Sequence, residues 1–138
     1  MFQELNKYTN NGHFFFNPGD VLSSVSKDVP NSQGVYYIIR LAKGKIDLVY
    51  IGKSGTVTQN GSFKDQGLRG RLNNKHEGVR RQEYFDDKIK SENIDALDIY
   101  WFVTFDNHNK DLPGYVEGLL LQRYFEIYGK LPPWNKGF

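Results

Sequence analysis

The stretch Gly34–Gly52, GVYYIIRLAKGKIDLVYIG, decides the fold of this chain. Its first part, Gly34–Leu41, is rich in the β-branched and aromatic residues that are typical of a strand. The turn-like residues Ala42–Lys45 separate it from a second strand-like run, Ile46–Gly52. We therefore expect a β-hairpin over this stretch.

Each strand of the predicted hairpin carries a tyrosine. If the turn is centred near Lys43, Tyr36 and Tyr50 face each other directly, and such cross-strand partners lie roughly 4.5–5.5 Å apart. Lys53 follows just beyond the second strand. Two phenols and an ammonium group would then share one patch, although paired tyrosines are also common as ordinary core or surface residues of aromatic-rich strands.

Patterning along the rest of the chain predicts one more strand and several helices. Ala96–Phe105 alternates between apolar residues and others, which indicates a third strand. Helices are expected at residues 68–75, 80–90 and 115–128, the last of them ending at Gly129. The polar, glycine-rich stretch 52–67 is typical of a functional or mobile loop.

These elements predict an α+β fold. A small central three-stranded, mainly antiparallel sheet, formed by hairpin 34–52 and strand 96–105, would be flanked by helices. A length of 138 residues is typical of one domain. Within it, we expect residues 1–30 to be an N-terminal extension packed on the core by its aromatic side chains, with a short helix near 18–26, and residues 31–135 to form the core.

The composition narrows the function. Aromatic residues make up 15% of the chain, which supplies material for a core and argues against disorder. There is no cysteine, so disulfides, thiolate nucleophiles and Cys-ligated zinc are excluded. The N-terminus has no signal-like segment and no apolar run is long enough for a membrane span, so we expect a cytoplasmic protein with no membrane partner. A net charge of +2 does not itself indicate a polyanionic partner.

Basic residues nevertheless cluster after the polar loop. Arg71 and Lys75 would share one face of the predicted helix 68–75, and a guanidinium group matches the geometry of a phosphate. Together with Arg69, Arg80 and Arg81 they are candidates for a nucleic-acid contact surface. A solvated basic helix face is the alternative interpretation.

Glu117 is the most informative single residue. On the predicted last helix it lies on one stripe with Leu121, Tyr124 and Tyr128, so it points toward the apolar side. Burying a carboxylate is costly unless it is compensated. A helix N-terminus supplies part of that compensation, and a hard divalent cation would supply the rest. A capping carboxylate with ordinary solvent access is the alternative.

Taken in order, these motifs form a series of five. They are Gly34-Val35-Tyr36, Tyr50-Ile51-Gly52-Lys53, Leu68-Arg69-Gly70-Arg71-Leu72, Glu117 at the opening of a helix, and Pro133-Trp134-Asn135. The series resembles the GIY-YIG nuclease family over about residues 29–135. The resemblance implies an endonuclease, a hydrolase of DNA phosphodiester bonds that uses one Mg²⁺ or Mn²⁺ ion per active site.

The resemblance also implies roles for the hairpin and the last helix. Either Tyr36 or Tyr50, with Tyr36 preferred, would act with a metal-bound water as the nucleophile or its general base. Lys53 would lower a phenol pKa or steady the nucleophile. Glu117 would be the sole metal-ligating carboxylate, and Asn135 would support the site from the C-terminus.

Arg71 matches the family's arginine that holds the scissile phosphate. The interval from Tyr50 to Arg71 contains an insertion relative to the family, so Arg69 competes for this role. His76 resembles a histidine that some members place shortly after the arginine, although here it lies five residues beyond Arg71.

A compact, stand-alone member with an insertion before the arginine resembles the restriction-type branch of the family. DNA is therefore the expected substrate, in preference to RNA, and a homodimer would be needed to cut two strands. Two alternatives stay open: a structure-specific or nonspecific DNase of a repair, mobile-element or toxin system, and a non-catalytic nucleic-acid-binding module with the same fold. Chemically competent residues at all five catalytic positions argue against the second.

Overall fold

The computed structural model describes residues 2–64, 66–76 and 78–138. Its centre is a four-stranded antiparallel sheet with the strand order β1-β6-β2-β3. These strands are β1 (Asn11–Phe16), β2 (Gln33–Ala42), β3 (Lys45–Lys53) and β6 (Ala96–Phe105). A separate short hairpin is formed by β4 (Lys75–His76) and β5 (Val79–Arg80).

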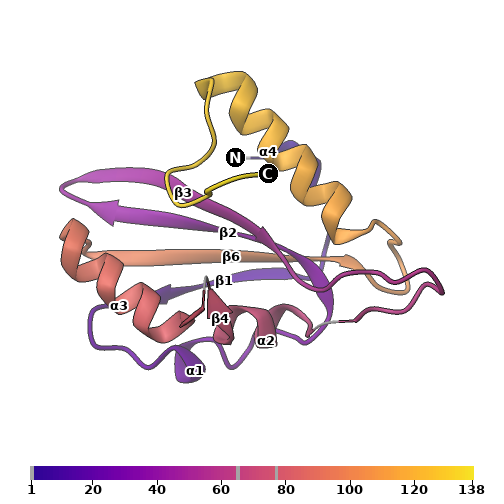
Figure 1. Cartoon of the computed structure of the whole chain (residues 1–138), viewed down its shortest axis with the longest axis horizontal. Coiled ribbons are helices and arrows are strands. Elements are labelled where there is room, and N and C mark those ends of the chain that lie inside the picture. The colour runs from indigo at the N-terminus through magenta and orange to yellow at the C-terminus, as the bar shows by residue number, and fades with distance from the viewer. Residues whose placement is uncertain (1, 65, 77) are drawn as a thin grey trace.

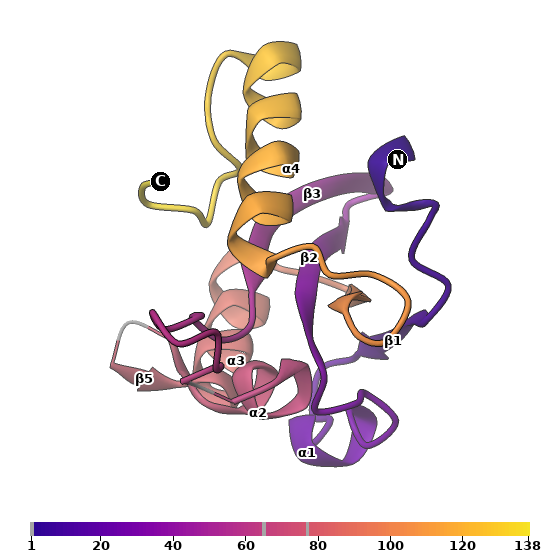
Figure 2. The same ribbon diagram turned by 90° about the vertical axis from the view of Figure 1, so that its right-hand side faces the viewer.

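Helices cover both faces of the sheet. They are η1 (Gln3–Leu5), α1 (Leu22–Val25), α2 (Leu68–Asn73), α3 (Arg81–Glu92) and α4 (Pro113–Tyr128). Helix α4 lies on one side of the sheet and α1, α2 and α3 lie on the other (Figures 1 and 2). Within the part of the chain that the structure describes, no helix has both the length and the apolar character needed to cross a membrane.

The expected α+β class is confirmed, but the sheet has four strands, where the sequence predicted three. The additional strand is β1, which pairs with β6 within the segment expected to be only a packed extension. Its aromatic run hid the alternation, because Phe14 and Phe16 pack into the core while Phe15 on the opposite face is 46% exposed. At Gly12, a Cβ atom would lie 2.7 Å from the Trp101 ring of the neighbouring strand.

The central strand β2 is buried on both faces, which explains its almost continuous apolar sequence. Tyr36 and Ile38 belong to the cluster under α1, α2 and α3, whereas Val35, Tyr37 and Ile39 belong to the cluster under α4. Two cores on opposite faces of one sheet therefore meet along this strand. Successive residues of β2 therefore pack on opposite faces of the sheet.

The hairpin register differs from the expected one. Ala42 pairs with Lys45 across a two-residue turn in which Lys43 and Gly44 both have positive φ, at 54° and 73°. The register then shifts between Ile38 and Ile39, so that Tyr36 pairs with Gly52 and not with Tyr50. The prediction failed for two reasons. The turn is centred between Lys43 and Gly44 and not on Lys43, which alone would pair Tyr36 with Ile51. The β-bulge, which adds one residue to a strand and leaves no clear mark in an apolar sequence, shifts the pairing by one more residue.

Three helix boundaries also needed correction. Helix α2 ends at Asn73, so Lys75 lies in β4 and does not share a helix face with Arg71 as predicted. The short helix expected near 18–26 is confined to Leu22–Val25. Helix α4 begins at Pro113, and Gly129 ends it in the left-handed conformation, as predicted.

Gly34 provides a test of the close approach between β2 and β6. A Cβ atom at this position would lie 1.9 Å from the backbone oxygen of Phe102, which cannot move without breaking the sheet. We expect Gly34→Ala to lower the free energy of unfolding by about 1–3 kcal/mol in a urea titration. Gly137→Ala, where nothing lies within 4 Å of the new atom, is the control; equal stability of the two variants would contradict the strand packing.

Candidate active site

The two hairpin tyrosines lie side by side although they are not direct cross-strand partners. Tyr50 is opposite Ile38, one pleat along from Tyr36 on the same face, and the two ring centroids are 5.9 Å apart. Gly52 makes this possible, because a Cβ there would lie 2.7 Å from the Tyr36 hydroxyl oxygen and 2.8 Å from the Tyr50 ring. The glycine thus lets the Tyr36 ring lie across β3.

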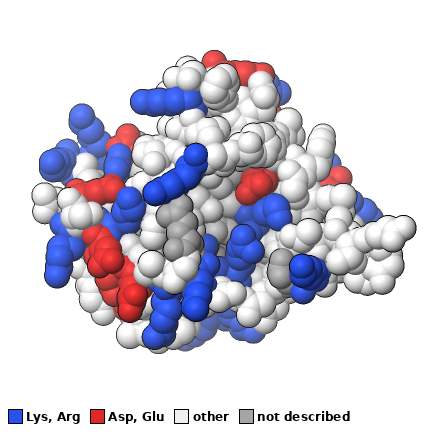
Figure 3. Space-filling model, viewed as in Figure 1, with Lys and Arg blue, Asp and Glu red and all other residues white. Residues whose placement is uncertain are grey.

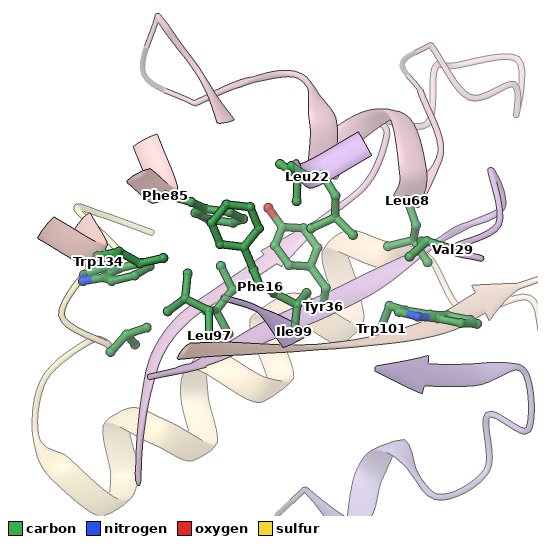
Figure 4. Packing of buried hydrophobic residues seen from close by; sticks show 14 of the residues in the cluster. Phe16, Leu22, Val29, Tyr36, Leu68, Phe85, Leu97, Ile99, Trp101 and Trp134 are labelled. Carbon is green, nitrogen blue, oxygen red and sulfur yellow. The ribbon is translucent and has the colours of Figure 1, made fainter. Parts of the chain in front are cut away.

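The two phenols have different environments. Tyr36 stands in the core among Phe16, Leu22 and Leu68 and is 1% exposed (Figure 4). Tyr50 is partly exposed. Burial is the main cause that raises the pKa of Tyr50 above its ordinary value, and the neighbouring Tyr36 adds to the rise. The phenol of Tyr50 therefore stays protonated at neutral pH.

Glu117 is carried by α4. Its carboxyl group is partly buried, and this burial raises its pKa, while the positive charges of Lys53 and Arg71 act in the opposite direction. The charges of Glu117 and Arg71 also act on the Tyr50 phenol. Charged side chains of α2 and α4 thus act on a phenol of β3, and their convergence on one pocket that seats a cation stays a prediction. The predicted inward stripe of α4 ends before Tyr128, which is 59% exposed.

The Lys53 side chain makes a local contact that the sequence did not indicate, and its expected role stays a prediction. Its ammonium group donates a hydrogen bond to the carbonyl oxygen of Gly55, at 2.7 Å, and its charge acts on Glu117. The cations that oppose the rise in the Tyr50 pKa are Arg81 and Arg71. Lys53 therefore compensates the Glu117 carboxylate, whereas Arg81 and Arg71 are the cations that act to lower the Tyr50 pKa.

The two candidate phosphate-binding arginines point to different places. Arg71 is partly buried, and its charge acts on Glu117 and Tyr50. Arg69 is exposed and donates a hydrogen bond to the carbonyl oxygen of Lys27, at 3.4 Å. Of the two, only Arg71 therefore shares the region of Glu117 and Tyr50.

Lys75 and Arg80 are exposed on the β4–β5 hairpin, beside this region. Figure 3 shows Lys and Arg side chains spread over the centre of this face, with acidic side chains among them. The predicted basic surface is thus present around the site, although Arg81, which was expected to belong to it, does not.

His76 is buried in β4 between two aromatic rings. Its ring centroid is 5.2 Å from that of Tyr50 and 4.2 Å from that of Tyr84. In the sequence, His76 lies five residues beyond Arg71, which is one residue more than in the family pattern. It nonetheless reaches the tyrosine pair, because the chain leaves α2 at Asn73 and turns into a strand.

Arg81 is the residue that the sequence interpretation misplaced. It is 2% exposed, and its guanidinium carbon lies 5.8 Å from the Tyr36 ring centroid and 6.0 Å from that of Tyr50. Arg81 differs from the neighbouring Arg80 because it lies one helical turn before Phe85 and two turns before Ile89, both of which are buried. This spacing is the sequence signal that could have placed Arg81 on the buried face. A basic residue on that apolar stripe points inward.

Asn135 closes the site from the C-terminal tail. Its side-chain oxygen accepts a hydrogen bond from the Ile51 N–H at 3.0 Å, and its side-chain nitrogen donates one to the Ile51 carbonyl at 2.9 Å. The preceding residue, Trp134, donates its backbone N–H to the Val49 carbonyl. The tail thus pairs with the outer edge of β3 at Val49 and Ile51, the two residues that flank Tyr50. This pairing fits the supporting role expected of Asn135.

The side chains of the candidate site match one type of divalent-cation site, in which the protein supplies few ligands. Within residues 2–64, 66–76 and 78–138, no three His, Cys, Asp or Glu side chains gather as a metal cage would require. Mg²⁺ in phosphoryl-transfer sites commonly takes one or two carboxylates and completes its coordination with water and substrate oxygens. Glu117, a partly buried carboxylate beside a hydroxyl group, fits that kind of site.

A cavity of about 650 Å³ lies elsewhere in the described part of the chain. Its lining includes Phe2, Asp47 and Tyr124, on the α4 side of the sheet. None of the candidate site's side chains lines it. The candidate site therefore lies apart from this cavity.

Comparison with protein families, curated proteins and solved structures finds no match to this chain. The resemblance to GIY-YIG nucleases therefore rests on the motif residues and on their positions in this fold.

Asn135 provides a test of how the tail supports the site. Asn135→Ala removes both partners of Ile51, so we expect the free energy of unfolding to fall by about 1–3 kcal/mol and the Ile51 amide to exchange its hydrogen faster. Asn135→Asp keeps an acceptor for the Ile51 N–H but loses the donor to the Ile51 carbonyl. Its stability and its exchange rate at Ile51 should lie between those of the wild type and of Asn135→Ala. Unchanged exchange at Ile51 in Asn135→Ala would contradict the pairing.

Proposed function

We propose that this chain is a metal-dependent endonuclease that hydrolyses DNA phosphodiester bonds. The observation that carries the proposal is the partly buried Glu117 carboxylate, whose charge acts on Tyr50 of the Tyr36–Tyr50 pair and is compensated by Lys53 and Arg71. A carboxylate, a guanidinium group and phenols within one region supply the groups that phosphodiester hydrolysis uses. Their motif order, which resembles that of GIY-YIG nucleases, supports the same reaction.

Each side chain has a part in this reaction that its environment favours. Arg71 would donate two hydrogen bonds to non-bridging oxygens of the scissile phosphate, where negative charge grows as water attacks. Tyr50, which stays protonated, would donate a hydrogen bond to the same group. Tyr36, whose hydroxyl lies over Gly52, is then the phenol left to orient the attacking water.

Glu117 would hold the cation, Mg²⁺ or Mn²⁺. When bound, such an ion supplies Lewis-acid stabilisation of the phosphate and makes water easier to deprotonate. Lys53 opposes the rise in the Glu117 pKa that burial causes. His76, in contact with the Tyr50 ring, would keep that ring in place, and Asn135 would hold the strand that carries it.

DNA is the substrate that we propose in preference to RNA. The exposed Arg69, Lys75 and Arg80 would bind the phosphates that flank the scissile one. Restriction-type cleavage is favoured, with a homodimer needed to cut both strands. In a plasmid assay, discrete fragments would support this assignment, whereas a smear would indicate a nonspecific DNase.

The Glu117 carboxylate is the first target for mutation. Glu117→Gln keeps the size of the side chain but removes the negative charge that would bind the cation, so we expect plasmid cleavage with Mg²⁺ or Mn²⁺ to fall by about 100-fold or more. The matched control is Glu126→Gln, an exposed glutamate of the same helix that contacts Arg123. Wild-type activity in Glu117→Gln would refute this role. No cleavage by the wild-type chain with any metal, together with DNA binding, would favour the non-catalytic binding module.

The two arginines of α2 provide a second, independent comparison. Arg71→Ala should lower kcat by about 100- to 1000-fold, because the developing charge on the phosphate loses its donor. Arg69→Ala should only weaken binding, with a smaller salt dependence of the affinity for DNA. Both are measured by single-turnover cleavage and by titration of labelled DNA at several salt concentrations. The reverse pattern would assign the scissile phosphate to Arg69.

A further inference from the structure

Arg81 is a buried cation without an ordinary partner. It is the first residue of α3 and is 2% exposed. Among the described residues, its Nε and Nη1 atoms have no hydrogen-bond partner, and none of the ion pairs includes it. A guanidinium group taken out of water in this way is expensive for the folded state.

The surroundings of this guanidinium are aromatic. Its carbon lies 5.8 Å from the ring centroid of Tyr36 and 6.0 Å from those of Tyr50 and Phe85. Cations over aromatic faces are attracted by the ring quadrupole. This attraction offsets only part of the lost hydration, and an apolar side chain of the same length would fill the space without that loss.

The backbone keeps Arg81 in this position. Its N–H donates a hydrogen bond to the carbonyl oxygen of Asn74, at 3.0 Å, directly after the helix that carries Arg71. Phe85, one turn further along α3, is fully buried. The start of α3 is therefore fixed, and the guanidinium group is fixed with it behind the two tyrosine rings.

We propose that Arg81 is a positioning residue, whose guanidinium group holds the Tyr36 and Tyr50 rings where hydrolysis needs them and is retained at a cost to folding stability. The inference rests on the proposed function, because it is the tyrosines that would contact the substrate. Arg81 itself lies behind them and touches no substrate. Its positive charge also faces the Tyr50 phenol from the buried side.

Three variants separate this role from a structural one. Arg81→Met removes the charge and keeps an unbranched side chain that fills the space. Arg81→Lys keeps the charge without the planar group, and Arg80→Gln changes the exposed neighbouring arginine as the matched control. The first readout is the set of ring resonances of ¹³C-labelled tyrosine in the free protein, in which Tyr36→Phe and Tyr50→Phe identify the two signals. The second is the thermal unfolding midpoint.

We expect Arg81→Met to shift the ring resonances of Tyr36 and Tyr50 and to leave the unfolding midpoint equal to or above that of the wild type. Arg80→Gln should change neither. In cleavage assays, kcat of Arg81→Met should fall roughly 100-fold, with KM changed much less because the residue is remote from the DNA. Arg81→Lys should recover part of kcat.

Two outcomes would overturn the inference. One is a set of unshifted tyrosine resonances in Arg81→Met. The other is a lowered unfolding midpoint in that variant, which would make Arg81 an ordinary stabilising residue. Neither readout requires nuclease activity, so a wild-type chain that cleaves no DNA would refute the proposed function while the resonances and midpoints still decide whether Arg81 positions the rings.

Discussion

The packing of the Tyr36 ring across Gly52 is the contact on which the candidate site depends. A side chain on Gly52 would occupy the place of the hydroxyl and of the neighbouring Tyr50 ring. The register shift between Ile38 and Ile39 is equally necessary, because it pairs Tyr36 with the glycine. The outer edge of β3 is then closed by Asn135, which satisfies the Ile51 backbone groups that an edge strand would leave open. Strand geometry, rather than any single interaction of the phenols, thus sets the two rings together.

Charge in this region is concentrated and only partly exposed. Lys53 and Arg71 act on one carboxylate, Glu117, while Arg81 and Arg71 act on the Tyr50 phenol. Interactions between such groups are stronger at the reduced dielectric of a partly buried site than on an open surface. This balance of charge supports the proposed binding of a phosphate by the cations and of a divalent ion by the single carboxylate.

Local patterning predicted much of the fold. The strand Ala96–Phe105 has the predicted bounds, and the helix that ends at Gly129 is confirmed, because a period of two and a left-handed C-terminal residue are local signals. The strand Asn11–Phe16 was missed because aromatic residues on both faces concealed its alternation. The end of the helix at Asn73 was misplaced, since the chain leaves it for a hairpin whose pairing is decided by neighbouring elements.

The sequence by itself determined which chemical groups are available and the order in which they occur: two hairpin tyrosines, a helical arginine, a carboxylate on an apolar stripe and a closing asparagine. These follow from residue identity and local period. Only the tertiary structure decided that Tyr36 pairs with Gly52, that Arg71 and not Arg69 shares the region of Glu117, and that Arg81 is buried behind the two phenols. Each of these depends on how separate elements pack against one another, and packing between distant segments is not encoded in any one of them.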